Sequence, residues 1–160
     1  MIRLAAKEDL AALEALYAAA RARMKEAGNP AQWKDSYPPR ALIEEDIARG
    51  RLYVCEEDAL VGAFVFFVGE EPCYRVIDGM WRTEARVYGV IHRVASDGAR
   101  RGFLKTVVGF CSKRADDLRI DTHRDNAPMR RALAREGFYP CGVIVTDDGT
   151  ERIAYEWVRG

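Results

Sequence analysis

The sequence has no hydrophobic run long enough to cross a membrane. Its longest uninterrupted apolar stretch is Leu60 to Val68, whereas a membrane-spanning helix needs roughly 20 apolar residues. The first residues, Met1 to Leu4, also lack the positive segment followed by an apolar segment that marks a secretory signal. We therefore expect a cytoplasmic protein without a membrane partner.

Cysteine and histidine are scarce, and they are not grouped. There are only two histidines, His92 and His123. The four cysteines include no close pair: Cys55, Cys73, Cys111 and Cys141. Disulfide frameworks and zinc sites contain closely spaced cysteine or histidine residues. The sequence therefore predicts four reduced thiols and no metal site.

The chain carries no net charge, because 25 Lys and Arg balance 25 Asp and Glu. A neutral protein is not attracted as a whole to nucleic acid, so we expect no nucleic-acid partner. The 160 residues, 49% of them hydrophobic, suffice for one well-packed core and are too few for two domains of usual size. We predict a single domain over residues 1–160.

Segments with a hydrophobic period of two alternate with segments of period near 3.6, which predicts a mixed α/β chain. Strands are expected at residues 2–5, 52–56, 60–68, 86–95, 118–122, 139–146 and 151–158. Helices are expected over about 20 residues after the first strand, and at residues 41–48, 104–115 and 127–136. Asp147-Asp148-Gly149 predicts a hairpin turn between the last two strands.

Positive charge gathers in the second half of the chain. Between His92 and Phe138 stand eleven Lys and Arg residues but only six Asp and Glu. A strand, a turn and a helix are expected there over residues 94–108, and the first turn of a helix offers unpaired N–H groups to an anion such as phosphate. The alternative is a solvated surface of basic side chains.

Two sequence blocks resemble the GNAT superfamily of acetyl-CoA-dependent N-acetyltransferases. The first is Ser96-Asp97-Gly98-Ala99-Arg100-Arg101-Gly102-Phe103-Leu104-Lys105-Thr106, which is similar to the family pattern V-x-P-x-x-R-G-x-G-x-G/A between a strand and a helix. It keeps the Arg101-Gly102 pair but has Leu104 and Thr106 in place of the two later glycines. In the second block, Asn126 stands eleven residues before Gly137-Phe138, as in the family.

The resemblance covers nearly the whole chain and implies a fold. The family has a central, mostly antiparallel sheet with a splayed pair of parallel strands, flanked by about four helices. Here the parallel strands are those ending near Ala95 and Thr122, and a bulge in the first separates them. The resemblance implies that acetyl-CoA binds at Val94, Ala95, Ser96, Arg101, Gly102, Phe103, Leu104, Lys105, Thr106 and Asn126. From the residues alone, Asn126 is also a good helix N-cap.

The activity implied by the resemblance is direct transfer of an acetyl group to a primary amine in a ternary complex, with no metal. We predict His92 as the catalytic base, because an imidazole titrates near pH 6.5 in water. A packing role for His92 is the alternative, and Glu84 and Asp121 are weaker candidates for the base. A backbone N–H near Val94 would bind the carbonyl oxygen of the transition state.

The proton donor for the departing thiolate is left open by the sequence. Many family members have a tyrosine seven residues after the asparagine, and this chain has Leu133 there. An aliphatic side chain donates no proton. Tyr139, His123, Cys141 or water would have to replace it, or the thiolate leaves without a dedicated acid.

The acceptor is expected to bind at Gln32, Trp33, Tyr37, Trp81 and His123. Aromatic rings in a proline-bounded loop are suited to enclosing an amine, although Trp33 and Tyr37 would equally serve to fix the loop to the core. Glu44, Glu45 and Asp46 are interpreted as the exposed face of a short helix. The expected acceptor is a small molecule or a peptide, and a homodimer is an alternative to a monomer.

Two rival functions remain at this point. The first is a CoA-binding or protein-interaction module of the same fold without turnover, which Leu104, Thr106 and Leu133 favour. The second is a nucleic-acid binder that uses the basic half of the chain.

Overall fold

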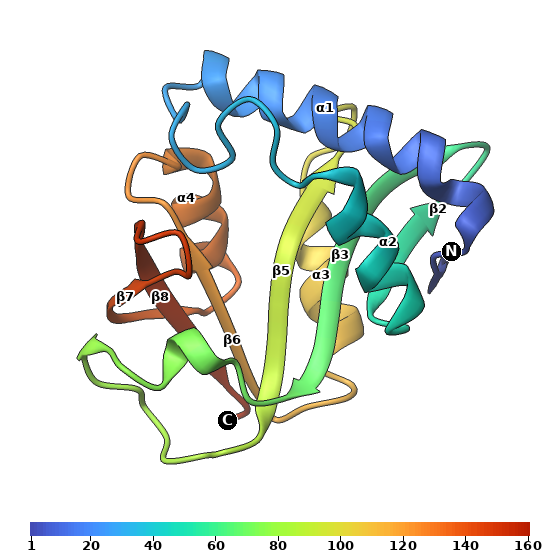
Figure 1. The fold of residues 1–160 in the computed structure, drawn as a ribbon. Helices are drawn as coiled ribbons and strands as arrows, with labels where there is room; N and C mark the ends of the chain where they lie inside the picture. The colour runs from blue at the N-terminus through green and yellow to red at the C-terminus, as the bar shows by residue number, and fades with distance from the viewer. The chain divides into compact units, whose positions relative to one another are not determined.

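A computed structural model describes all residues from 1 to 160 and shows a mixed α/β fold (Figure 1). The strands are β1 (Ile2–Leu4), β2 (Leu52–Glu56), β3 (Leu60–Gly69), β4 (Asp78–Gly79), β5 (Tyr88–Ser96), β6 (Asp117–Thr122), β7 (Tyr139–Val145) and β8 (Glu151–Val158). The α-helices are α1 (Leu10–Glu26), α2 (Arg40–Ala48), α3 (Phe103–Cys111) and α4 (Ala127–Arg135). Two short 3-10 helices cover Lys7–Asp9 and Pro72–Tyr74.

The strands form one mixed sheet in the order β1-β2-β3-β5-β6-β8-β7-β4. β5 and β6 run parallel, in register from Gly89↔Leu118 to Ile91↔Ile120. The pairs β1–β2, β2–β3, β6–β8, β7–β8 and β4–β7 are antiparallel. The expected fold class, a mostly antiparallel sheet with one parallel pair and four helices, is confirmed.

The expected elements are all present, with small differences at their ends. The first helix is shorter than expected, and the helix predicted to reach residue 115 ends at Cys111. The sequence did not predict β4 or the two 3-10 helices. These pieces span only two or three residues each, which is too short to give a periodic pattern.

The chain divides into two compact units. The first contains Met1–Phe66 and His92–Phe103, and the second contains Phe67–Ile91 and Leu104–Gly160. The prediction of one domain over residues 1–160 stays a prediction.

In the first unit, α1 buries one stripe of side chains. Leu13, Leu16, Tyr17 and Ala20 are buried at the spacing of one helical face, and α1 lies beside α2 (Figure 1). Gly62 of β3 provides room for another contact, because a Cβ atom at this glycine would lie 2.2 Å from the ring of Phe103. The first residue of α3 is therefore packed against a strand position without a side chain.

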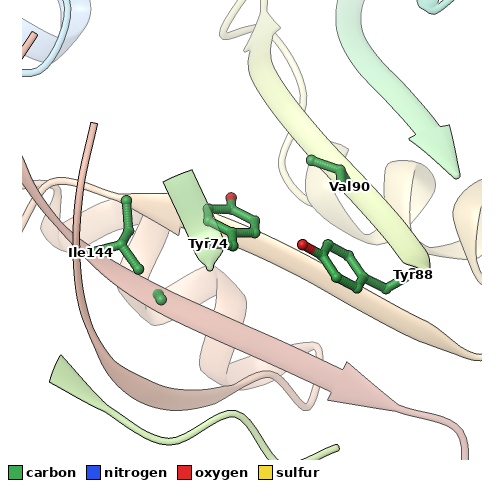
Figure 2. Packing of buried hydrophobic residues seen from close by; sticks show 5 residues of the cluster. Tyr74, Tyr88, Val90 and Ile144 are labelled. Atoms are coloured by element: carbon green, nitrogen blue, oxygen red, sulfur yellow. The ribbon is translucent and has the colours of Figure 1, made fainter. Parts of the chain in front are cut away.

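The second unit contains an aromatic cluster (Figure 2) built on Tyr74, Tyr88, Val90 and Ile144. The rings of Tyr74 and Tyr88 are stacked, with 6.4 Å between their centroids. The Tyr88 hydroxyl accepts a hydrogen bond from the N–H of Glu71 over 3.0 Å. The polar ends of the rings are thus satisfied while their faces are buried.

The same unit encloses a cluster of buried charged groups. Glu156 and Asp117 are buried near Arg119, whose guanidinium lies 4.3 Å from the Trp81 ring and 4.0 Å from the Tyr88 ring. The Thr83 hydroxyl lies within hydrogen-bond distance of both carboxyl groups and has one proton to donate between them. Burial raises the pKa of Glu156, and the neighbouring Asp117 raises it further. Glu156 therefore loses its proton less readily in the folded protein than in the unfolded chain.

Two further observations bear on the expectations from composition. No helix is both long enough and apolar enough to cross a membrane. All four cysteines are free, and Cys55, Cys111 and Cys141 are buried.

Gly62→Ala should lower the free energy of unfolding by about 1–3 kcal/mol, because the added methyl group overlaps the Phe103 ring. Gly69→Ala in the same strand is the matched control, since its Cβ would meet only Phe67 at 3.7 Å, an ordinary contact. Urea denaturation measures both. Equal effects of the two substitutions would contradict the proposed overlap.

Glu156→Gln should change how stability depends on pH. Because the pKa of Glu156 is raised by folding, its protonated form contributes to the free energy of unfolding. This contribution is complete below about pH 4.5, the ordinary pKa of the group in the unfolded chain. It is lost as the pH rises through the pKa of the folded protein. The variant should therefore gain stability relative to the wild type as the pH rises from about 4.5 toward 8.

Urea denaturation of the two proteins across that pH range provides the comparison. Glu151→Gln, an exposed position in the same strand, should show no such trend. A difference between wild type and Glu156→Gln that stays constant with pH would contradict the assignment.

Candidate functional site

The centre of the candidate site in the first unit is an irregularity in β5. Arg93 has φ 49°, which is the left-handed region that residues other than glycine rarely adopt. It lies two residues beyond Ile91, which is paired in parallel with Ile120. A left-handed residue inside a strand interrupts the pleat and is typical of a bulge. The family resemblance implies a bulge in this strand, and that bulge stays a prediction.

Three side chains hold Arg93 in this conformation. Its Nε and Nη2 donate to the two carboxylate oxygens of Asp46, each over 2.9 Å. Its Nη1 donates to the Tyr37 hydroxyl over 3.0 Å. The Tyr17 hydroxyl donates to the Arg93 carbonyl over 2.9 Å. α1, α2 and the loop between them therefore all contact one residue of β5.

The interpretation of Asp46 as an exposed residue is wrong. Asp46 is 1% exposed, and it also accepts a hydrogen bond from Arg51 over 2.8 Å. Burial lowers the pKa of Arg93, but Tyr37 and Asp46 more than compensate, so the net shift is upward and the guanidinium stays charged. The signal for this was the spacing of Asp46 from Ile43, since residues three apart share a helix face.

The other expected acceptor residues of the first unit lie in the loop between α1 and α2. Trp33 is buried, and its ring meets that of Tyr17 in a T-shaped arrangement with 5.6 Å between the ring centroids. Gln32 accepts a hydrogen bond from Asn29 over 3.0 Å. Tyr37 is half-buried and bonded to Arg93. Trp33 thus fixes the loop to the core, and roles in acceptor binding stay predictions.

His92, the predicted base, is half-buried in β5 directly before Arg93. Val94 and Ser96 are half-buried and Ala95 is buried. Because His92 and Val94 flank the left-handed residue in sequence, the network around Arg93 sets the direction of the chain at both positions.

The turn that follows β5 is held by the first unit on several sides. The Asp97 N–H donates to the Val61 carbonyl over 2.9 Å, and Arg23 donates to the Ser96 carbonyl. Gly98 and Gly102 have φ 78° and 81°. At Gly102 a Cβ atom would meet nothing within 4 Å, so this glycine is needed for its backbone angle and leaves the turn open. Arg101 is exposed.

The first residues of α3 differ in exposure. Phe103 is half-buried over Gly62, Leu104 is 6% exposed, and Lys105 and Thr106 are exposed. The leucine that replaces a family glycine is therefore buried within the protein. The first N–H groups of α3 have no partner inside the helix, and Arg101 and Lys105 are near them in sequence. Binding of CoA phosphates here stays a prediction.

In the second unit, Asn126 caps α4. Its Oδ1 accepts a hydrogen bond from the Met129 N–H over 3.3 Å, so the N-cap prediction is confirmed. The contact with the CoA arm that the resemblance implies stays a prediction.

His123 is buried three residues before Asn126. Its Nδ1 accepts a hydrogen bond from the Asp125 N–H over 3.1 Å, which assigns the ring proton to Nε2. Burial lowers the pKa of His123 below its usual value of 6.5. The ring is therefore mostly neutral at pH 7, with its one N–H at Nε2.

The other candidates in the second unit are engaged in structural contacts. Trp81 donates its indole N–H to the Tyr74 carbonyl over 3.0 Å. Asp121 accepts a hydrogen bond from the Tyr74 hydroxyl over 2.7 Å. Glu84 is exposed. These contacts give Trp81 and Asp121 defined packing roles beside any part in binding or catalysis.

The candidates for the missing acid differ in exposure. Leu133 is fully buried, whereas Tyr139 is 57% exposed. Cys141 is buried, and burial raises the pKa of its thiol. No group of three or more His, Cys, Asp or Glu side chains is arranged to hold a metal ion.

Comparison with known proteins places this geometry in a family, although no protein-family model and no curated protein matches the chain. An acetyltransferase of the GNAT family from Streptococcus agalactiae has 30% sequence identity and a TM-score of 0.88, with 100% of this chain and 95% of that chain covered. A GNAT acetyltransferase from Listeria monocytogenes has 21% identity and a TM-score of 0.71, with 99% and 94% covered.

An aminoglycoside acetyltransferase in complex with coenzyme A and kanamycin shares the fold. Its identity is 19% and its TM-score 0.67, with 99% of this chain and 94% of that chain covered. At full coverage, 30% identity to the Streptococcus agalactiae protein goes beyond a likeness of fold. The chain belongs to the GNAT family of acetyltransferases.

Proposed function

We propose that this protein transfers an acetyl group from acetyl-CoA to a primary amine of a small molecule or peptide, directly and in a ternary complex. The observation that carries the proposal is the left-handed Arg93 in β5, followed by an open turn at Gly102 and the start of α3. Acetyl transfer in general agrees with the structural neighbours, which are acetyltransferases.

The range of acceptors among the neighbours supports an amine. One neighbour is an aminoglycoside acetyltransferase bound to kanamycin, another is an agmatine N-acetyltransferase, and a third is a ribosomal-protein-alanine N-acetyltransferase. All three names describe transfer to nitrogen or to an amine-bearing compound. The acceptor of this chain is assigned only to that class.

In this proposal the chain holds acetyl-CoA mainly through its backbone. Residues Val94 to Ser96 would bond the pantetheine arm as a neighbouring strand does. The turn at Arg101 and Gly102, with the N–H groups at the start of α3, would bind the diphosphate. Lys105 would add a positive charge, and Asn126 would contact the arm from its N-cap position.

The chemistry assigns separate tasks to His92 and Val94. His92 takes a proton from the attacking amine as the new C–N bond forms at the acetyl carbon. The Val94 N–H donates to the carbonyl oxygen while that oxygen carries negative charge. The C–S bond then breaks, and the thiolate sulfur takes a proton from Tyr139, His123, Cys141 or water, or leaves without one.

The wild-type protein should bind CoA, and Arg101→Ala should weaken the binding about tenfold through loss of a charged contact to phosphate. Arg49→Ala, which removes an exposed arginine of the first unit, is the matched control and should leave affinity unchanged. Isothermal titration calorimetry with CoA measures all three proteins.

Thiol release from acetyl-CoA in the presence of amines, amino acids, polyamines, aminoglycosides and peptides then tests turnover. A wild-type protein that does not bind CoA would overturn the proposal. CoA binding without thiol release across this panel would instead favour a binding module without activity.

His92→Ala should lower the rate of thiol release by about 10²-fold, because a general base contributes at least that much. CoA affinity should change little, and the fall in rate toward acidic pH should disappear, since that limb reports protonation of the base. The rate measured across pH with an active amine checks this. A variant that keeps the acidic limb would show that the base is another group.

A further inference from the structure

We propose that Asp46 is a positioning residue for acetyl transfer, because it fixes Arg93 in the left-handed conformation that directs the Val94 N–H toward the acetyl carbonyl. This inference rests on the proposed function. Asp46 itself would touch neither substrate. It acts through the side chain of Arg93, to which it is joined by two hydrogen bonds.

The first argument is the conformation of Arg93. At φ 49° the Cβ atom of a non-glycine residue is crowded by its own backbone, and such residues persist only where the surroundings hold them. No glycine stands at this position, so the conformation depends on what grips the arginine. Asp46 supplies two of the three hydrogen bonds made by its guanidinium.

The second argument is the burial of the pair. The Arg93 and Asp46 side chains are 10% and 2% exposed. Two charges brought out of water are held only in a geometry that satisfies both, and the planar guanidinium matches a carboxylate in one orientation. Arg51 donates to Asp46 from the end next to β2. The carboxylate is thus held by Arg51 as well as by Arg93, and its fixed position determines where the Arg93 guanidinium lies.

The third argument is that the same arginine reaches the loop expected to bind the acceptor. Arg93 Nη1 donates to the Tyr37 hydroxyl, and the Tyr37 carbonyl accepts from Arg21 of α1 over 3.1 Å. A change in the position of Tyr37 would therefore move the Arg93 side chain, and with it change the direction of the neighbouring Val94 N–H. The network links the acceptor loop to the atom proposed to polarise the thioester.

The test uses the full chain and Asp46→Asn, which keeps the shape of the side chain and removes its charge. Glu45→Gln is the matched control, since Glu45 is the preceding residue of α2, is exposed and pairs only across the surface with Arg49. The probes are CoA and acetyl-CoA in calorimetry, and [1-13C]acetyl-CoA in infrared difference spectroscopy. Urea denaturation establishes that each variant is folded.

In the wild type and in Glu45→Gln, binding should move the thioester carbonyl stretch to lower frequency. In Asp46→Asn, most of this shift should be lost, and the preference for acetyl-CoA over CoA should fall about fivefold, as expected for one hydrogen bond. Affinity for CoA itself should change little. A purely structural role would lower stability without changing the carbonyl signal of the folded, ligand-bound protein.

Tyr37→Phe serves if Asp46→Asn does not fold, because it removes a single hydrogen bond to Arg93 and should reduce the carbonyl shift in the same direction. An unchanged carbonyl shift in folded Asp46→Asn, or in Tyr37→Phe where the former is unfolded, would overturn the inference while the proposed function stands. Failure of the wild type to bind acetyl-CoA would overturn both.

Discussion

The first unit depends on one buried ion pair, that between Asp46 of α2 and Arg93 of β5. A left-handed conformation costs an arginine about 1–2 kcal/mol. Breaking a buried ion pair by removing one partner costs about 3–5 kcal/mol. Releasing Arg93 from its left-handed conformation would separate these buried charges, so the strained conformation is retained. Tyr17 and Tyr37 bond to the same residue, so the two helices and the loop between them have their positions set by one strand residue.

Under the proposed function, the turn after β5 binds CoA with an altered motif. If CoA is held by backbone N–H groups, the turn needs the right backbone angles and space more than particular side chains. Gly102 supplies a left-handed angle with open space around it, and Leu104 lies buried in place of a glycine. The turn has left-handed glycines at Gly98 and Gly102, while Leu104 and Thr106 depart from the family pattern.

The candidate site could be predicted from sequence where the signal is local. The Asn126 cap, the glycines of the turn and the strand carrying His92 each follow from a few adjacent residues. Asp46 and Tyr17 did not emerge as site residues, because their importance comes from Arg93, at least 47 residues away in sequence. Trp33 is a similar case, since its contact with Tyr17 makes it part of the core. The aromatic cluster around Tyr74 likewise includes segments that lack a periodic pattern.

The sequence by itself determined the order of strands and helices, the ends of most of them, the turn after β5 and the family they indicate. Periodicity, glycine positions and capping residues act over a few neighbours, so they can be read without a fold. Tertiary structure alone decided that Asp46 is buried, that Arg93 is left-handed, and that α1, α2 and β5 meet at one guanidinium. Burial and ion pairing involve residues that are distant in the chain, and only tertiary packing determines which face of a short helix is buried.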